Sequence, residues 1–278
     1  MPFIDTQNQD VKALTGIHLY HFWLSSCSQR VRMVLDEKGL AWTGHEIDLE
    51  KMEHATEEFQ SINPKGLVPA MVVDGRVMIE SIDIIDYLDT TYPEPPLRPA
   101  TKDDEAEMLK WMADADDAQH SLKLLTHEFL FKMHKMPPEA LAHLVASHRN
   151  DELTEFMKVW ASDAGFPKDE IDEELKIQHD YFVALDGALN GRRWLLGDRF
   201  SLADIAWVPN VHRLDLMDYP LDRHPNLFGW YARIKERPSY HAGVLSSEIP
   251  PAMEAFAAYC EQRRAEGTDV TRFGPLAA

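Results

Sequence analysis

Cysteine is scarce in this chain of 278 residues, since only Cys27 and Cys260 occur. Two distant cysteines cannot build a disulfide scaffold, so that class is excluded and a reducing, cytoplasmic location is expected. Long apolar runs are also absent, because no stretch approaches the roughly 20 residues that a membrane-spanning helix needs. Residues 1–5 have neither a basic region nor an apolar core, so no signal peptide is predicted.

Positive charge is in short supply as well. The 28 Lys and Arg residues face 47 Asp and Glu residues, which gives a formal net charge of −19. Such a charge repels phosphate backbones and anionic bilayers, so neither nucleic acid nor a membrane is expected as a partner. Glycine-rich nucleotide loops, the G-x-S-x-G elbow of hydrolases and H-E-x-x-H are absent. His120 and His127 are seven residues apart, which is not metal-ligand spacing, and no metal is expected.

The first third of the chain has the pattern of a small α/β domain. After an N-terminal arm over 1–16, apolar and aromatic runs alternate with helical periodicity in the order β-α-β-α-β-β-α. The turn Asp74-Gly75 joins two apolar runs and predicts a hairpin, and Ser81 is expected to cap the helix that follows. We therefore expect an α/β unit with a mixed sheet over 17–92.

The remainder of the chain is predicted to be all-α. A proline-dense linker over 93–102 cannot continue a helix. Apolar residues then recur at helical spacing throughout 103–260, and Ser201 with Asp204 forms a capping-box variant. The polar, aperiodic residues 261–278 are expected to be a tail.

A polar loop, Ser25 to Arg30, lies between the first apolar strand and the first helix. Free N–H groups at a helix start favour an anion, and a hydroxyl there can donate a hydrogen bond to a thiolate. The alternative is that these serines only cap the helix. Two-thiol redox chemistry is excluded, because the C-x-x-C positions are occupied by Ser25 and Ser28. A one-thiol route through Cys27 remains an alternative.

Two further segments have features of a peptide-binding site. Pro69 enters a strand, and a cis Val68–Pro69 bond would turn the Val68 backbone outward to pair with an extended ligand. Glu80 suits a ligand ammonium, and Ser81 suits a ligand carboxylate. The alternatives are an ordinary loop proline and simple capping by Ser81. Together with the serine loop, these segments predict a site for a zwitterionic thiol peptide.

These residues carry a family resemblance over about 17–245. Residues 25–32 are similar to the zeta-class loop of the cytosolic glutathione S-transferase superfamily. Asn63-Pro64-x-Gly66-x-Val68-Pro69 and Glu80-Ser81-x-x-Ile84 are similar to its glutathione-binding segments, and 201–206 resembles the capping motif of its helical domain. The resemblance implies a thioredoxin-like α/β N-terminal domain, an all-α C-terminal domain, glutathione as cosubstrate, and a homodimer or a heterodimer with a paralogue.

The resemblance also implies roles for individual residues. Ser25 takes the place beside the glutathione sulfur, Ser28 aligns instead with the serine of some bacterial ether-cleaving members, and Cys27 has a supporting role. The residues implied to bind glutathione are Ser26, Lys65, Val68, Pro69, Glu80 and Ser81. A second substrate is expected between the 22–24 loop and the first long helix of the second domain. The candidate lining residues, of which we expect two to face the substrate and the rest to be packing, are Phe22, Trp23, Trp111, Ala115, His120 and Trp207.

The substrate class is narrowed by resemblance alone. Residues 165–174 are similar to a segment of bacterial β-aryl ether-cleaving transferases, and 202–217 resembles both these and the glutathione-dependent dehalogenases. We therefore expect attack of glutathione thiolate on an aromatic electrophile with release of a phenol. The alternatives are a maleyl-type cis–trans isomerase, for which Arg30 and Arg32 could supply basic charge, a reductive dehalogenase, and a non-catalytic binding protein.

Overall fold

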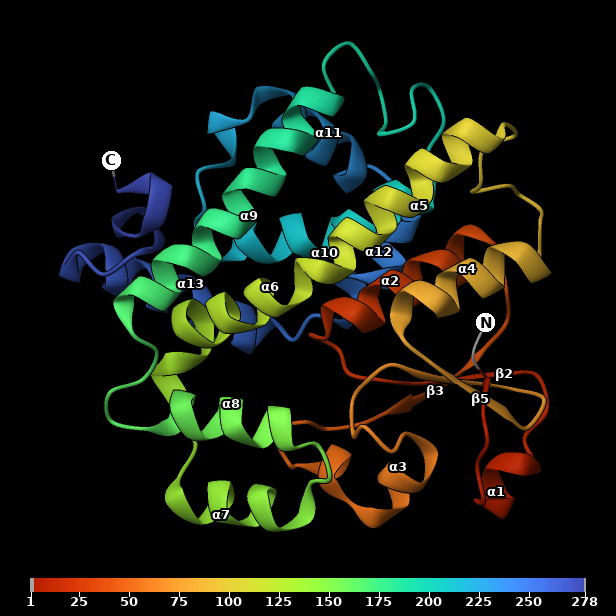
Figure 1. Ribbon diagram of the computed structural model, residues 1–278, viewed down its shortest axis with the longest axis horizontal. Coiled ribbons are helices and arrows are strands. Elements are labelled where there is room, and N and C mark those ends of the chain that lie inside the picture. Colours follow the sequence, from red (N-terminus) through yellow and green to blue (C-terminus); the bar gives the residue numbers. More distant parts are fainter. Residues whose placement is uncertain (1–2, 278) are drawn as a thin grey trace.

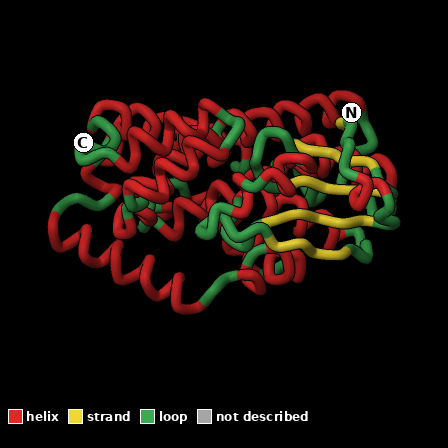
Figure 2. Tube along the Cα trace, turned by 90° about the horizontal axis from the view of Figure 1, so that it is seen from below, coloured by secondary structure: helices red, strands yellow, loops and turns green. Residues whose placement is uncertain are grey.

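A computed structural model describes residues 3–277 of the chain. A five-stranded sheet lies at one end of the molecule, and helices fill the rest (Figure 1, Figure 2). The strands are β1 (Phe3–Ile4), β2 (Ile17–His21), β3 (Thr43–Glu46), β4 (Ala70–Val73) and β5 (Arg76–Ile79). Their order across the sheet is β1-β5-β4-β2-β3, in which β2 and β3 are parallel and the other neighbours are antiparallel. The expected mixed sheet is confirmed.

The β4–β5 hairpin forms where the sequence predicts it. Asp74 and Gly75 have φ angles of 48° and 76°, which are the left-handed conformations that a tight two-residue hairpin turn requires. On one face of the sheet lie α2 (Ser26–Glu37) and α4 (Ser81–Thr91), and on the other lies α3 (Glu57–Ile62) (Figure 1). This arrangement is the thioredoxin-like domain that the resemblance implies.

The N-terminal arm is more ordered than its sequence indicates. β1 pairs with β5 at the sheet edge, and α1 (Gln9–Lys12) follows it. Val11 is buried in a small core, and the Thr6 hydroxyl donates to the Ser61 carbonyl at 3.1 Å. A strand of two residues is too short to show a period, which is why the expectation of a loose arm was wrong.

The second part of the chain is helical, as expected. In chain order its helices are α5 (Lys102–Asp117), α6 (Gln119–Thr126), α7 (Pro138–Ser147), α8 (Asp151–Ala161), α9 (Lys168–Ala188), α10 (Leu202–Leu216), α11 (Pro225–Lys235), α12 (Pro238–Gly243) and α13 (Pro250–Glu266). A π-helical turn over His127–Phe131 extends α6. α10 is the central helix, because every residue from Leu202 to Leu214 is buried. No helix in residues 3–277 is both long and apolar enough to cross a bilayer.

The capping box at the start of α10 is present. The Ser201 amide donates to Asp204 Oδ2 at 3.0 Å, and Asp204 Oδ1 accepts from the Leu195 amide and from Trp230 Nε1. This carboxylate is fully buried and joins three segments of the helical domain. The motif therefore does more than begin a helix, because it also fixes the segment over 194–199 and α11.

The C-terminal residues pack onto the helical domain. Beyond α13, short 3-10 turns bury Val270 and Leu276, and the Gly274 amide donates to Asp172 Oδ1 on α9 at 2.8 Å. The expectation of a free tail is therefore corrected. Val270, Phe273 and Leu276 anchor the segment, which is too few apolar side chains to give a recognisable pattern among its polar residues.

Candidate functional site

Ser25 caps the N-terminus of α2. Its Oγ accepts from the Ser28 amide at 3.2 Å, and its carbonyl accepts from the Gln29 amide at 2.9 Å. The residue is partly exposed. Because Oγ already serves as an acceptor, its proton can be donated outward, next to the free amides of the first turn, Ser26 and Cys27. This arrangement places one hydroxyl and the positive end of a helix beside any anion at the loop.

The two serines of the loop have opposite environments. Ser28 is fully buried, and its Oγ faces the Phe22 amide at 3.5 Å. The two candidate serines thus differ in exposure, since Ser25 is partly exposed and Ser28 faces the core. Ser26 is also largely buried, and its Oγ accepts from Gln119 Nε2 on α6 at 2.8 Å. The Ser26 side chain thus joins the loop to the helical domain. Only its backbone amide remains as a donor to a ligand.

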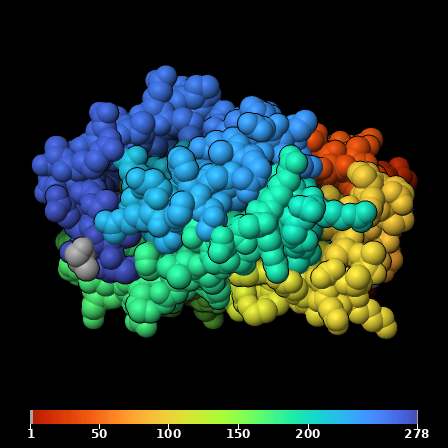
Figure 3. Space-filling model, turned by 90° about the horizontal axis from the view of Figure 1, so that it is seen from above, coloured from red at the N-terminus to blue at the C-terminus, as the bar shows by residue number. Residues whose placement is uncertain are grey.

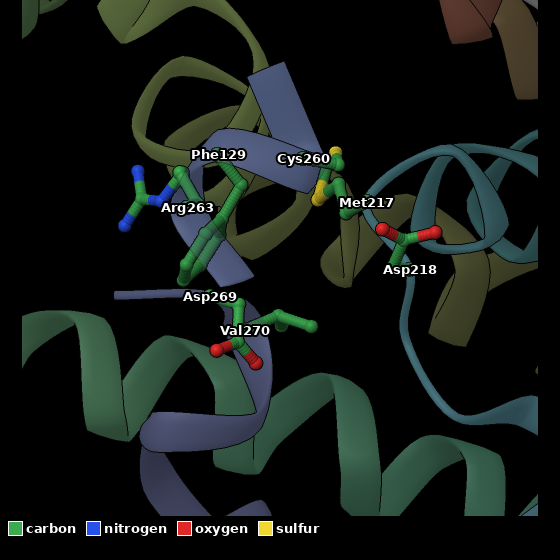
Figure 4. Close-up of a pocket in the computed structure, with 7 residues that line it drawn as sticks. All are labelled: Phe129, Met217, Asp218, Cys260, Arg263, Asp269 and Val270. Atoms are coloured by element: carbon green, nitrogen blue, oxygen red, sulfur yellow. The ribbon is translucent and has the colours of Figure 1, made fainter. Parts of the chain in front are cut away.

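Neither thiol is disposed to ionise. Burial raises the pKa of the Cys27 thiol, an effect that nearby Arg30 and the hydrogen-bonding Ser81 only oppose. Burial also raises the pKa of Cys260 to about 11. Cys260 borders a cavity of only about 10 Å³ between α13 and the end of α10, too small for more than a water molecule (Figure 4). Burial thus disfavours the thiolate form of both cysteines.

The segment before β4 leaves backbone groups free for a ligand. The Val68–Pro69 peptide is cis, as the resemblance implies, and Val68 is partly exposed. The Val68 amide and carbonyl form no hydrogen bond within residues 3–277, so both can pair with an extended peptide. The loop is held from behind by the helical domain, since His148 Nε2 lies 3.2 Å from the Gly66 carbonyl.

Glu80 occupies a strained position between β5 and α4. Its φ of 68° is unusual for a residue with a side chain, and its carboxylate is exposed. Lys65 Nζ lies 2.6 Å from Glu80 Oε1, so the two groups expected to hold opposite charges of a ligand pair with each other. Ser81 is the first residue of α4 rather than its cap, and its hydroxyl accepts from Arg30 Nη1 at 3.2 Å. The expected capping by Ser81 is corrected accordingly.

Arg30 joins the two domains from inside the core. Its guanidinium is fully buried and donates to the Ala206 carbonyl at 2.9 Å, the Ala115 carbonyl at 2.7 Å and Asn210 Oδ1 at 3.0 Å. Arg32 is also buried and donates to main-chain carbonyls, among them that of Gly243 at 2.8 Å. Both arginines are therefore used by the fold, and the basic pocket that a maleyl-type diacid would need is not built from them.

Most of the expected substrate-lining residues belong to the core. Ala115 and Trp207 have no exposed surface, and Trp207 Nε1 donates to the Trp111 carbonyl at 3.0 Å. Phe22, Trp23 and Trp111 are buried as well. His120 is the exception, since more than half of its side chain is exposed and Nε2 lies 3.8 Å from Glu174 Oε1. The expectation is thus corrected for Ala115 and Trp207, whose apolar side chains pack between α5 and α10.

The face of α6 toward the serine loop was missed at the sequence level. Gln119 binds Ser26, and the Arg213 guanidinium donates both to the Leu24 carbonyl and, at 3.4 Å, to Thr126 Oγ1. No local motif marks Gln119 or Arg213, because their partners lie more than 80 residues away in the sequence. Only the periodicity of α6 could have indicated which of its residues share a face.

A larger cavity lies away from the serine loop. It measures about 340 Å³ and is lined from α10 to α13, where His212 Nε2 lies 2.9 Å from Glu248 Oε1 and Nδ1 lies 3.0 Å from the Tyr231 hydroxyl. The space-filling view shows the C-terminal helices, in blue, over the left and upper part of the molecule, and α12 among them packs against α2 of the first domain (Figure 3). None of the residues that line this cavity belongs to the serine loop.

Comparison with known families identifies the class. Residues 24–91 match the model of the glutathione S-transferase N-terminal domain, and residues 168–233 match that of the C-terminal domain. The chain is 30% identical over 235 residues to the protein LigF of Sphingobium, covering 80% of this chain and 91% of that protein. With the thioredoxin-like sheet, the helical second domain and the exposed Ser25 at a helix start, the chain belongs to the glutathione S-transferase family.

Individual relatives differ in their activities. The crystal structure of β-etherase LigF superposes with a TM-score of 0.75 at 28% identity, covering 82% of this chain and 98% of LigF. The maleylpyruvate isomerase of Ralstonia is 31% identical, covering 74% of this chain and 88% of that enzyme. Glutathione S-transferase Z2 of Arabidopsis thaliana is 48% identical over 85 residues, which is 30% of this chain and 38% of that protein. These relatives establish the family and leave the electrophile to be proposed.

Proposed function

We propose that this protein activates glutathione at Ser25 as a thiolate, which attacks a hydrophobic aromatic ether and releases a phenol. The observation that carries the proposal is the partly exposed Ser25 at the N-terminus of α2, in a loop where burial disfavours ionisation of the Cys27 thiol. Similarity to the β-etherase LigF over most of both chains supports the ether as electrophile.

The donor set fits glutathione along its length. The free backbone of Val68, with Pro69 behind it, suits pairing with the central cysteine residue of the tripeptide. The exposed Glu80 carboxylate and the Ser81 amide suit the ammonium and carboxylate of the γ-glutamyl end. Lys65 is then free to bind the glycine carboxylate. In this proposal the ligand charges replace the Lys65–Glu80 pair, whose partners are both about half exposed.

The energies are sufficient for ionisation at neutral pH. A free thiol has a pKa of about 8.5, so only a few per cent is thiolate near pH 7. A helix start contributes about 0.3–2 kcal/mol, and a hydrogen bond to an anion contributes about 1.5–3 kcal/mol. Because 1.4 kcal/mol corresponds to about one pKa unit, these two interactions lower the thiol pKa by one to a few units. No general base is needed, which agrees with a loop built from serines.

A matched pair of serine variants tests the site. Ser25→Ala is expected to raise the pKa of bound glutathione, read from the ultraviolet absorbance of the thiolate, and to lower kcat/KM about 10- to 100-fold, because a hydrogen bond to an anion is lost. Ser28→Ala, which changes only a buried hydroxyl, serves as the control and should leave the thiol pKa in place. An unchanged thiol pKa in Ser25→Ala would contradict the proposal.

The electrophile is tested separately. With glutathione, the wild-type protein should release a phenol from a model β-aryl ether and form the thioether in equal amount. Isomerisation of a maleyl-type diacid without consumption of glutathione would favour the activity by which the Ralstonia relative is named. Turnover of neither substrate, with glutathione still bound as thiolate, would restrict the proposal to thiol activation alone.

A further inference from the structure

Lys123 is placed on the side of α6 that faces the serine loop. Gln119, one turn earlier, donates to Ser26 Oγ at 2.8 Å. Thr126, one turn later, is joined through Arg213 to the Leu24 carbonyl. Because residues 119, 123 and 126 share one face of a helix, the Lys123 side chain leaves α6 on the side of the loop that carries Ser25.

The Lys123 ammonium has an aromatic neighbour and no polar partner. Its Nζ lies 4.0 Å from the centre of the Phe156 ring on α8, and it forms no hydrogen bond or ion pair within residues 3–277. This contact joins α6 to α8. A partly exposed cation that forms no ion pair can bind an oxygen anion from an organic substrate.

Further aromatic side chains lie next to Phe156. The His127 ring makes edge contacts with Phe131, Phe156 and Trp160, at centroid distances of 4.9–5.1 Å. Burial lowers the pKa of His127 to about 3, so this imidazole stays neutral at pH 7. The positive charge in this aromatic cluster is therefore supplied by Lys123. The surrounding rings suit an aromatic substrate.

The charged and titratable groups around Lys123 tune its ammonium. Burial lowers the pKa of Lys123 to about 8, and Glu152 at the start of α8 opposes this change. Burial lowers the pKa of His148, which contacts Gly66 in the loop before Val68, and of His127, and the Lys123 charge contributes to both shifts. The contact with Phe156 on α8 and the shared face with Gln119 place Lys123 near both helices and the serine loop.

We propose that Lys123 receives the aryl oxygen that departs when glutathione thiolate cleaves the ether, so that the protein acts on ethers of weakly acidic phenols. This inference rests on the function proposed above and names its leaving group. The bond between the glutathione sulfur and the substrate carbon forms while the carbon–oxygen bond breaks, and the electron pair goes to the aryl oxygen. A proton from Lys123 Nζ neutralises that oxygen, and the amine regains a proton from water.

Two ethers that differ only in the phenol test the proposal. A methoxyphenol leaves poorly, since an ordinary phenol has a pKa of about 10, whereas a nitrophenol leaves as a stable anion without protonation. In Lys123→Met, kcat/KM is expected to fall about 100-fold for the methoxyphenyl ether and less than about fivefold for the nitrophenyl ether, because proton donation contributes 10²–10⁴-fold. Lys123→Arg should restore part of the loss while shifting the alkaline limb of kcat to higher pH.

Two controls separate the possible outcomes. Lys158→Met removes an exposed lysine of α8 that pairs with Glu155, and should leave both ether rates unchanged. Equal losses for the two ethers in Lys123→Met, or no loss, would overturn the proposal while leaving thiolate attack intact. Failure of the wild-type protein to cleave either ether, although it conjugates glutathione to an aryl chloride, would instead overturn the etherase function on which the proposal rests.

Discussion

Two parts of this molecule meet at the site, and they relate differently to the family. The segments matched by the family models, 24–91 and 168–233, contain the serine loop, the Val68 loop, Glu80 and the central helix α10. The stretch between them, 92–167, lies outside both matches and provides Gln119, Lys123 and the aromatic residues of α8. The shared part thus contains the residues proposed to activate the thiol, and the intervening stretch contributes side chains that the two family models do not cover.

The two parts also differ in the chemical groups that they offer to a ligand. The shared part offers amides, carbonyls and short side chains, which fit the invariant tripeptide by backbone geometry. The intervening stretch offers long side chains, such as Lys123 and Phe156, whose exchange can change substrate preference without disturbing the glutathione loops. Three variants at the junction of the two parts test how far the parts depend on each other.

The largest expected effect is that of Arg30→Met. Arg30 extends from the shared helix α2 to the Ala115 carbonyl in the intervening stretch, and its loss leaves several buried acceptors without donors. The free energy of unfolding in urea is expected to fall by about 3–5 kcal/mol. Lys176→Met, which removes an exposed ion pair on α9, should cost less than about 1 kcal/mol. Similar values for both variants would show that the two parts are energetically independent.

The second prediction concerns pH and His54. Burial, together with nearby His148 from the intervening stretch, lowers the pKa of His54 from 6.5 to about 4. Between these values the unfolded chain binds a proton that the folded protein does not, so stability falls as the pH drops from 6.5 toward 4 and is unaffected above about pH 7. At pH 5 the loss is about 2 kcal/mol.

Urea unfolding at pH 7 and pH 5 measures this loss. In His54→Leu the difference between the two pH values should shrink by about 2 kcal/mol, although other buried histidines such as His21 still contribute. An unchanged difference would mean that the two parts do not enclose His54 in solution.

The smallest effect is expected for Gly66→Ala. Gly66 has a φ of 61°, and an added Cβ would lie 2.4 Å from His148 Nε2. Stability should fall by somewhat more than about 1 kcal/mol, and KM for glutathione should rise because the Val68 loop shifts. Gly191→Ala, with a φ of 73° and open space around it, isolates the conformational cost. Equal losses of stability and an unchanged KM would indicate that His148 yields to the new methyl group.

Local features of the sequence predicted most of the fold. The Asp74-Gly75 hairpin and the Ser201–Asp204 capping box were predicted correctly because all their determinants lie within a few residues. The arm pairing through Phe3 and the packed segment around Val270 were not, since each depends on a few long-range contacts.

The site was predictable to a similar extent. Local motifs located the serine, Val68 and Glu80 segments, but Ser25 and Ser28 are one helical turn apart, and only the packing of α2 shows which hydroxyl is exposed. Lys123 carries no motif, because its significance comes from Phe156 and the loop at residue 24, which are brought together by the fold. Aromatic periodicity likewise could not distinguish core residues such as Trp207 from residues that line a substrate site.

The buried guanidinium of Arg30 bears on how new transferases can arise by recombination. A chimera could join the first 92 residues of this chain to the helical half of a distant homologue. In such a chimera the helical half would have to supply hydrogen-bond acceptors for the Arg30 guanidinium. Unless the donor half presents acceptors where Ala115, Ala206 and Asn210 stand here, the hybrid would enclose an unsolvated charge. Gene fusion at the linker is therefore restricted to parents that have both Arg30 and its acceptors.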